Sequence, residues 1–319
     1  MAKIAIITGI SGQDGSYLSR LLIKKKYKVI GISNPKNKSK IKPTNIKIEN
    51  IDINNFKKIA NLIKKIKPNE FYHLAAQSFI NYNFEDEFFK LNPNINGTHY
   101  ILSAIKKYSP KTRFYFAASS EIFGDAKKYP QNENSQFNPR SAYGISKVAG
   151  YQITKNYREA YNLYTCSGIL YNHESSLRNK KFVSKKITSA VARIFLRKQK
   201  KIILGNINSK RDWGYAEDYV EAMWKMLQLK KAQDFVIGTG KLHSVKDFLK
   251  IAFNYVGLDY KKYVHTDKKF IRPKDSAILL ADTKKAQKIL NWRPTTSFKS
   301  LVKKMVDFEL NLLKKTYKN

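Results

Sequence analysis

Short apolar runs and amphipathic stretches alternate along the first half of the chain. The runs are typical of buried strands, and apolar residues spaced three and four positions apart are typical of helices. The predicted strands are residues 3–8, 27–32, 46–52, 70–76, 113–119 and 164–171. The predicted helices are residues 16–26, 55–66, 94–107 and 142–161. This order predicts an α/β fold with a doubly wound parallel sheet, because parallel neighbours need a crossover connection.

The pattern is less regular after Tyr171. The predicted helices there are residues 184–198 and 244–257, and the predicted strands are residues 200–206 and 233–240. Ser244 is the expected cap of the second helix. No internal repeat or low-complexity linker divides the chain. We therefore predict a first domain at 1–170, to which 211–240 return, and a smaller interwoven substrate lobe at 171–319.

Composition indicates a folded chain. Of its 319 residues 42% are hydrophobic, including 18 Phe and 20 Tyr, so it can bury enough apolar area to offset its ordering entropy. The single Cys166 excludes an intramolecular disulfide. The first residues lack a signal-peptide pattern, and no apolar run approaches the roughly 18 residues that span a bilayer. We predict a soluble cytoplasmic protein with no membrane partner.

The formal net charge of +37 suggests an anionic partner. The lysines, however, are spread along the whole chain, and Lys, Asn and Ile are abundant together. The sequence shows no helix-turn-helix signature, zinc spacing or aromatic RNA-binding motif. We therefore predict no specific nucleic-acid partner and no metal site, while the charge would still attract phosphate-bearing small molecules.

A glycine-rich turn, "TGISGQDGSYL", follows the first predicted strand. Gly9, Gly12 and Gly15 have the spacing Gly-x-x-Gly-x-x-Gly. In this position glycines permit a tight turn and let the backbone approach a pyrophosphate at the helix N-terminus. The turn predicts a dinucleotide site.

The end of the second strand bears on the choice of dinucleotide. NAD-selective sites usually carry an acid there, but this chain has "GISNPKNKSK", with Lys36 and Lys38. The segment favours NADP without excluding NAD. Asp52, at the end of the third strand, is a candidate for the adenine edge.

Tyr143 and Lys147 in "SAYGISK" lie four residues apart at a helix start, on one face. A nearby ammonium group lowers the pKa of a phenol, so we expect Tyr143 to act as a general base near neutral pH.

These motifs resemble, in the same order, those of the extended short-chain dehydrogenases/reductases, and within them most closely the GDP-mannose 4,6-dehydratase family. The similar segments include "FYHLAAQS", "RFYFAASSEIFG", "NPRSAYGISK", "YNHES" and "KRDWGYAEDYVEAMW". The resemblance runs nearly end to end. It implies a Rossmann-type fold and a lyase that uses its nicotinamide catalytically to make a 4-keto-6-deoxy sugar for surface polysaccharides.

The resemblance also implies catalytic roles for three residues that follow the strand at 113–119. Glu121 matches the family's carboxylate base, which removes the C5 proton after oxidation at C4. Ser119 stands where the family has a threonine that binds the C4 oxygen. Ser120 lies between them and is expected to help protonate the leaving hydroxyl.

The remaining predicted contacts fall into two groups. The expected cofactor contacts, besides Tyr143 and Lys147, are Gly9, Gly12, Gln13, Asp14, Gly15, Asp52, Ile53, Leu74, Ala75, Ala76, His173 and Arg178. The expected GDP-sugar contacts, with the arginines holding the diphosphate, are Asn172, Val183, Lys186, Arg211, Arg272 and Asp275.

The chain departs from the family at two places. The loop "SNPKNKSKIKPTN" is shorter than the family's and lacks its arginines, so we predict a homodimer through the helices near 94–107 and 142–160, with a tetramer as the alternative. The loop and Ser119 leave the sugar open: mannose, a heptose or N-acetylglucosamine. A nucleotide-sugar C4 reductase or epimerase, or a nucleic-acid-binding scaffold, are the alternative functions, and Glu121 and the Tyr-Lys pair argue against them.

Overall fold

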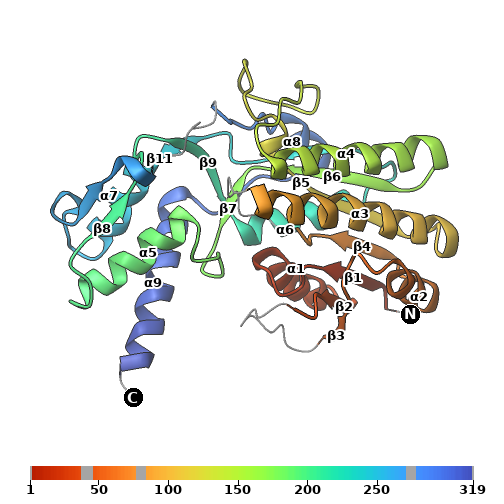
Figure 1. Cartoon of the computed structure of the whole chain (residues 1–319), viewed down its shortest axis with the longest axis horizontal. Coiled ribbons are helices and arrows are strands. Elements are labelled where there is room, and N and C mark those ends of the chain that lie inside the picture. The colour runs from red at the N-terminus through yellow and green to blue at the C-terminus, as the bar shows by residue number, and fades with distance from the viewer. Residues whose placement is uncertain (1, 37–45, 77–83, 271–277, 318–319) are drawn as a thin grey trace.

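The computed structural model describes residues 2–36, 46–76, 84–270 and 278–317, which form a larger and a smaller lobe (Figure 1). The larger lobe is built on one seven-stranded sheet of order β10-β6-β5-β4-β1-β2-β3, in which every neighbouring pair is parallel. Its strands are β1 (Ile4–Thr8), β2 (Lys28–Ser33), β3 (Lys47–Asn50), β4 (Glu70–His73), β5 (Arg113–Ser119), β6 (Thr165–Leu170) and β10 (Phe235–Ile237). The predicted doubly wound parallel sheet is confirmed.

Helices cover both faces of this sheet because alternate strand residues point to opposite sides. Ile6 and Phe71 pack in a core with helices α2 (Phe56–Ile66), α3 (Phe84–Tyr108) and α4 (Ala142–Tyr161). Ile7 and Tyr72 pack in a second core with helices α1 (Gln13–Lys24), α6 (Ala216–Met226) and α8 (Lys284–Leu290).

The smaller lobe has a core of its own, around Trp213 and Phe248. A three-stranded sheet contains β7 (Asn172–Glu174), β9 (Lys210–Tyr215) and β11 (Leu242–Ser244), and a two-stranded one contains β8 (Ile202–Leu204) and β12 (Val264–Thr266). Three helices, α5 (Val183–Phe195), α7 (Val245–Tyr255) and α9 (Phe298–Tyr317), pack around it. The short 3₁₀ turns η2 (Tyr260–Lys262) and η3 (Lys268–Phe270) flank β12, whereas η1 (Ser120–Ile122) follows β5 in the larger lobe. Ser244 caps α7 in a capping box with Asp247, as predicted for a cap at this position.

The chain passes between the lobes more than once. After β7 and α5 in the smaller lobe, it returns through α6 and β10, and β10 adds to the edge of the large sheet beside β6. The division at residue 170 stays a prediction. Helix α3 differs from its prediction: it starts at Phe84, well before residue 94, and runs through Pro93.

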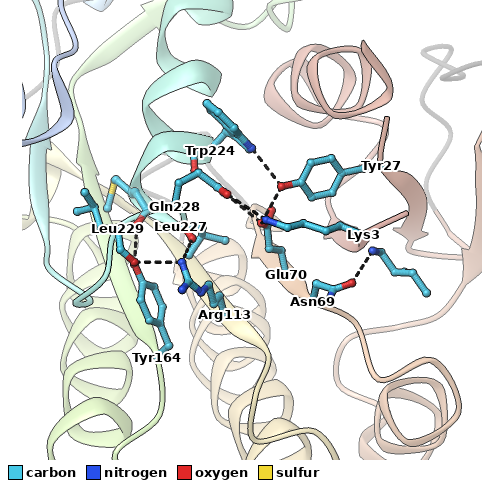
Figure 2. A network of polar contacts seen from close by, with 12 residues as sticks. Lys3, Tyr27, Asn69, Glu70, Arg113, Tyr164, Trp224, Leu227, Gln228 and Leu229 are labelled. Atoms are coloured by element: carbon cyan, nitrogen blue, oxygen red, sulfur yellow. Dashed lines mark hydrogen bonds and ion pairs between the residues drawn. The ribbon is translucent and has the colours of Figure 1, made fainter. Parts of the chain in front are cut away.

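The amino edge of the large sheet is closed by the polar network drawn in Figure 2. Buried Glu70, at the start of β4, accepts hydrogen bonds from the Tyr27 hydroxyl (2.8 Å), the Tyr72 hydroxyl (2.7 Å) and Gln228 Nε2 (3.1 Å). Arg113, at the start of β5, donates to two backbone carbonyls just after α6, at 2.6 and 3.0 Å. The side chains of Glu70 and Arg113 thus connect the end of α6 to the sheet by hydrogen bonds.

Within the described residues, no helix is long and apolar enough to cross a membrane.

Candidate active site

A cleft of about 1300 Å³ opens at the opposite, carboxyl edge of the sheet and extends onto the smaller lobe. This is where an open α/β sheet places its ligands. All predicted site residues that the structure describes line it: Gly9, Gly12, Gln13, Asp14, Gly15, Asp52, Ile53, Leu74, Ala75, Ala76, Ser119, Ser120, Glu121, Tyr143, Lys147, Asn172, His173, Arg178, Val183, Lys186 and Arg211. Arg272, Asp275 and Lys38 lie outside the described residues.

The glycine turn fits a phosphate group. Gly9 has φ +70°, and a Cβ there would lie 2.9 Å from the backbone nitrogen of Ala75. A Cβ on Gly15 would lie 2.5 Å from the Gly9 carbonyl oxygen. Gly12 is the N-cap of α1 and lines the cleft, so the cap position itself carries no side chain where the helix meets the cleft. Backbone N–H groups and the helix dipole favour an anion at this point.

The ends of β2 and β3 form one end of the cleft. Ser33, Asn34 and Lys36 line it, and Ser33 Oγ lies 3.3 Å from Ser11 Oγ. Asp52 Oδ1 accepts a hydrogen bond from the backbone N–H of Asn54 at 2.9 Å. A small polar and basic surface therefore follows β2, as the sequence predicts.

The end of β4 is fixed by a buried pair, Thr8 and His73, that no sequence pattern indicated. Thr8 Oγ1 accepts hydrogen bonds from the backbone N–H groups of Leu74 and Ala75, both at 3.1 Å, and lies 2.8 Å from His73 Nδ1. Burial, aided by the charge of Lys147, lowers the pKa of His73 to about 3, so this imidazole is neutral. Thr8 can then donate its O–H to His73 Nδ1. Together these hydrogen bonds hold the segment from Leu74 to Ala76 against the glycine turn.

Ser119, Ser120 and Glu121 lie where β5 turns into η1. The Ser119 hydroxyl caps this turn by accepting a hydrogen bond from the Glu121 N–H at 3.3 Å. Helix α4 starts beside this turn. A Cβ on Gly144 would lie 2.7 Å from the Glu121 carbonyl oxygen, so the glycine permits this close approach. This close approach brings Tyr143 near Ser119, whose hydroxyl acts on the pKa of the phenol.

Lys147 is buried at the strand ends, and Tyr143 is half-buried beside it. Lys147 Nζ donates to the Ala117 carbonyl at 2.6 Å and lies 5.7 Å from the centre of the Tyr143 ring. Burial raises the pKa of Tyr143 to about 12, with Glu121 acting in the same direction and the nearby Ser119 hydroxyl acting against it. Burial also lowers the pKa of Lys147 to about 7. The expected lowering of the tyrosine pKa is wrong for this structure, because desolvation disfavours the charged form of both groups.

Asn94 and Ser146 are two more residues behind this pair that the sequence did not indicate. Asn94 Nδ2 donates to Ser146 Oγ at 3.0 Å, and Ser146 Oγ donates to the Tyr143 carbonyl at 2.8 Å. This chain of bonds ties α3 to the first turn of α4. It depends on two helices meeting, which no local pattern reveals.

The smaller lobe supplies basic and apolar side chains to the cleft. Lys186 and Arg211 line it, with Ile203 and Phe270, whose side chains are about half exposed. Cations beside exposed apolar groups suit a ligand that joins a diphosphate to a flat ring.

Solved structures share this fold. A UDP-glucose 4-epimerase from Thermotoga maritima, solved with UDP-glucose, superposes with a TM-score of 0.87 at 23% identity over 97% of this chain and 99% of that one. A dTDP-glucose 4,6-dehydratase from Bacillus anthracis, solved with NAD, gives 0.84 at 19% identity over 98% of each chain. With the glycine turn and the Tyr-x-x-x-Lys pair, the fold is that of the extended short-chain dehydrogenases/reductases.

Sequence comparison narrows this class. The family model for GDP-mannose 4,6 dehydratase matches residues 6–305, and the chain belongs to this family. GDP-mannose 4,6 dehydratase 1 of Arabidopsis thaliana is 42% identical over 330 residues, covering 98% of this chain and 91% of the relative. The human enzyme is 38% identical over 344 residues, covering 98% and 92%.

Proposed function

We propose that this protein converts GDP-mannose to GDP-4-keto-6-deoxymannose by removing one water, the 4,6-dehydration that the names of its relatives give for them. The observation that carries the proposal is that Ser119, Glu121, Tyr143 and Lys147 meet at one point of a cleft that also reaches the glycine turn. A carboxylate beside the Tyr-Lys pair supplies a second base. Elimination of water needs this base, whereas a simple oxidation of the sugar does not.

We propose NADP as the cofactor, with NAD as the alternative. When bound, it accepts a hydride from C4 of the sugar and later returns it to C6. The glycine turn would hold its diphosphate, and Ser33, Asn34 and Lys36 would face the ribose that carries the extra phosphate of NADP. Identification of the dinucleotide released by denaturing the purified protein tests this choice.

Oxidation at C4 requires a base for the C4 hydroxyl. Tyr143 is the residue placed to take that proton, and Ser119, which lies near it on the cleft wall, can bind the same oxygen. Since burial holds the pKa of Tyr143 at about 12, ionisation of the phenol needs a positive charge nearby, and Lys147 is the cation on the same helix face. We propose that Lys147 has this role.

Elimination follows because the C4 carbonyl acidifies the C5 proton. We propose that Glu121 removes this proton, that the C5 electron pair forms the C5–C6 double bond, and that the C6–O bond breaks. Ser120, buried next to Glu121 on the cleft wall, is placed to relay this proton from Glu121 to the leaving oxygen, which departs as water. After hydride addition at C6, C5 takes up a proton from solvent.

The two parts of the substrate fit different walls. We assign the dinucleotide to residues 1–170 with the returning 211–240, and the nucleotide sugar mainly to residues 171–319. Lys186 and Arg211, together with Arg272 and Asp275 beyond the described residues, would hold the GDP moiety, and Asn172 and Val183 would contact it from β7 and α5.

We also propose that two copies pair through α3 and α4, which lie together on one face of the large sheet (Figure 1). Ile145 and Tyr161 on α4 are half exposed at this surface. Light scattering of the purified protein distinguishes this dimer from a tetramer.

Mass spectrometry tests the function. The protein with its cofactor is incubated separately with GDP-mannose, a GDP-heptose and GDP-N-acetylglucosamine, and each mixture is examined for the loss of one water. We expect the loss from GDP-mannose. Loss from another sugar alone would reassign the substrate, and loss from none would favour the reductase or epimerase alternative.

A further inference from the structure

Asp14 carries a negative charge close to the point where the cofactor's diphosphate would bind. It lies in the first turn of α1, two residues after Gly12, and lines the cleft. A carboxylate is favourable at a helix N-terminus, but it would repel a phosphate bound at the same end. The arrangement therefore requires a compensating positive charge, and His173 of β7 lies against Asp14.

The hydrogen bonds of His173 define its protonation state. Nδ1 lies 2.8 Å from the carbonyl oxygen of Tyr171, and Nε2 lies 2.9 Å from Asp14 Oδ2. A carbonyl oxygen and an ionised carboxylate can only accept hydrogen bonds, so both ring nitrogens must carry a proton. The ring is then an imidazolium.

The groups around this pair support its charges. The Tyr219 ring stacks on His173 with centroids 4.6 Å apart, and Gln13 Nε2 donates to Asp14 Oδ1 at 3.0 Å. The charge of Asp14 raises the pKa of His173 against the effect of burial, and His173 lowers the pKa of Asp14.

Among the described residues, Arg178 is the other charged group that acts on His173. Arg178 opposes the imidazolium, but its Nε lies 3.0 Å from Glu174 Oε2, and its guanidinium lies 3.6 Å from the centre of the Phe182 ring. Ser184 donates to the same Glu174 oxygen. Arg178 is thus held in a fixed place beside the pair.

Gln13 adds a second link between the same two segments. Its Nε2 donates to the His173 carbonyl at 3.1 Å, and its Oε1 accepts from Ser175 Oγ at 2.7 Å. The glycine turn is therefore tied to β7, the first strand of the smaller lobe, by both side chains and backbone.

We propose that Asp14 is a positioning residue that keeps His173 doubly protonated, so that an imidazolium and the Arg178 guanidinium together face the bound dinucleotide. The proposal rests on the proposed use of such a cofactor. Asp14 and His173 act as one neutral pair that also sets the spacing between the N-terminus of α1 and the smaller lobe.

The first test measures the protonation of His173 directly. The chain has five histidines, and nitrogen NMR of ¹⁵N-histidine-labelled holoenzyme, with the His173 signals assigned from a His173→Gln variant, reports the state of both ring nitrogens. We expect both to be protonated at pH 7.5 in the wild type, and the ring to be neutral at this pH in Asp14→Asn. A neutral His173 in the wild type would overturn the proposal, as would a ring that stays charged in the variant.

The second test measures release of the dinucleotide between pH 6 and 8. In Asp14→Asn we expect release to become about tenfold faster as the pH rises through the ordinary histidine pKa of about 6.5, because the imidazolium is lost. In the wild type and in Asp125→Asn, a control at an exposed carboxylate outside the cleft, release changes over this range only with the titration of Lys147, and the change is smaller than in Asp14→Asn. An equal increase at every pH in Asp14→Asn would show a merely structural role and contradict the proposal. Both tests are independent of turnover on GDP-mannose, so failure of the proposed reaction and failure of this inference are separate results.

Discussion

The two edges of the large sheet use buried polar residues in opposite ways. At the amino edge, Glu70 receives three hydrogen bonds from protein groups, and Arg113 spans two carbonyls (Figure 2). At the carboxyl edge, burial disfavours the charged forms of Tyr143 and Lys147. It raises the pKa of the Tyr143 phenol and lowers the pKa of the Lys147 ammonium group. The same strands β4 and β5 therefore begin in a stabilising network and end in a site whose groups are held ready to change protonation.

This contrast shows why a buried charge alone does not mark a catalytic residue. Glu70 is as buried as any group in the cleft, but its oxygens are occupied by tyrosine and glutamine side chains on the closed side of the sheet. Glu121 is a carboxylate beside the open cleft and next to a tyrosine whose pKa it raises. The same substitution at each edge should therefore have opposite consequences.

Glu121→Gln should have the largest effect. Without a base for the C5 proton, we expect the rate of water loss from GDP-mannose to fall by about 10³-fold, in the range for a general base. The thermal midpoint and the retained dinucleotide should be unchanged. Steady-state assays with mass-spectrometric detection measure the rate, and undiminished turnover would remove Glu121 from the mechanism.

Lys147→Met should reveal the cost of burying the ammonium group. The folded pKa of about 7 lies below the ordinary 10.5, so between these values the unfolded chain binds more protons and the wild type gains stability as pH rises. The free energy of unfolding of the wild type, minus that of the variant, should therefore rise by at most about 1.4 kcal/mol per pH unit. Urea titrations at pH 7 and pH 9 measure it, and a constant difference would contradict this assignment.

Glu70→Gln should separate stability from activity. The amide keeps the size of the side chain, but it cannot accept from both tyrosines and loses a charge-assisted bond, so we expect a loss of about 2 kcal/mol in the free energy of unfolding. The turnover number should stay within about twofold of the wild type, because Glu70 is far from the cleft along β4. A large loss of turnover with unchanged stability would invalidate the comparison of the two edges.

Lys3→Met should have the smallest effect. Lys3 Nζ lies 3.8 Å from Glu70 Oε1 and its side chain is 54% exposed, so the ion pair is screened by water. We expect a change below about 1 kcal/mol in the free energy of unfolding, from the same urea titrations. A loss as large as that of Glu70→Gln would show that the lysine, and not the tyrosines, stabilises Glu70.

The sequence predicted the large sheet well because its strands are short apolar runs separated by helices of clear period. It missed α6, which begins directly after β9 at Tyr215 with no side-chain cap bond to mark its start. It also missed α9, although the buried Leu301, Val302, Met305 and Val306 have helical spacing within a lysine-rich segment. The start of α6 has no capping residue that the sequence would reveal. The apolar residues of α9 do have helical spacing, but the lysines between them obscure this pattern.

The candidate site was predictable as a set of residues but not as an electrostatic arrangement. The glycine turn and the Tyr-Lys pair are local patterns, and the family resemblance added Glu121. The contact between Asp14 and His173 joins positions 159 residues apart, and the raised pKa of Tyr143 depends on burial by several elements. Neither property has a local signature.

The most direct test of the central claim, a complete dehydratase site at the carboxyl edge, follows one hydrogen atom. GDP-mannose carrying deuterium at C4 is incubated with the holoenzyme in ordinary water, and the product is examined by NMR and mass spectrometry. We predict loss of one water and transfer of the deuterium to C6, because the same bound nicotinamide accepts and returns it. Deuterium retained at C4 with no loss of water, or a dehydrated product without deuterium at C6, would contradict the account.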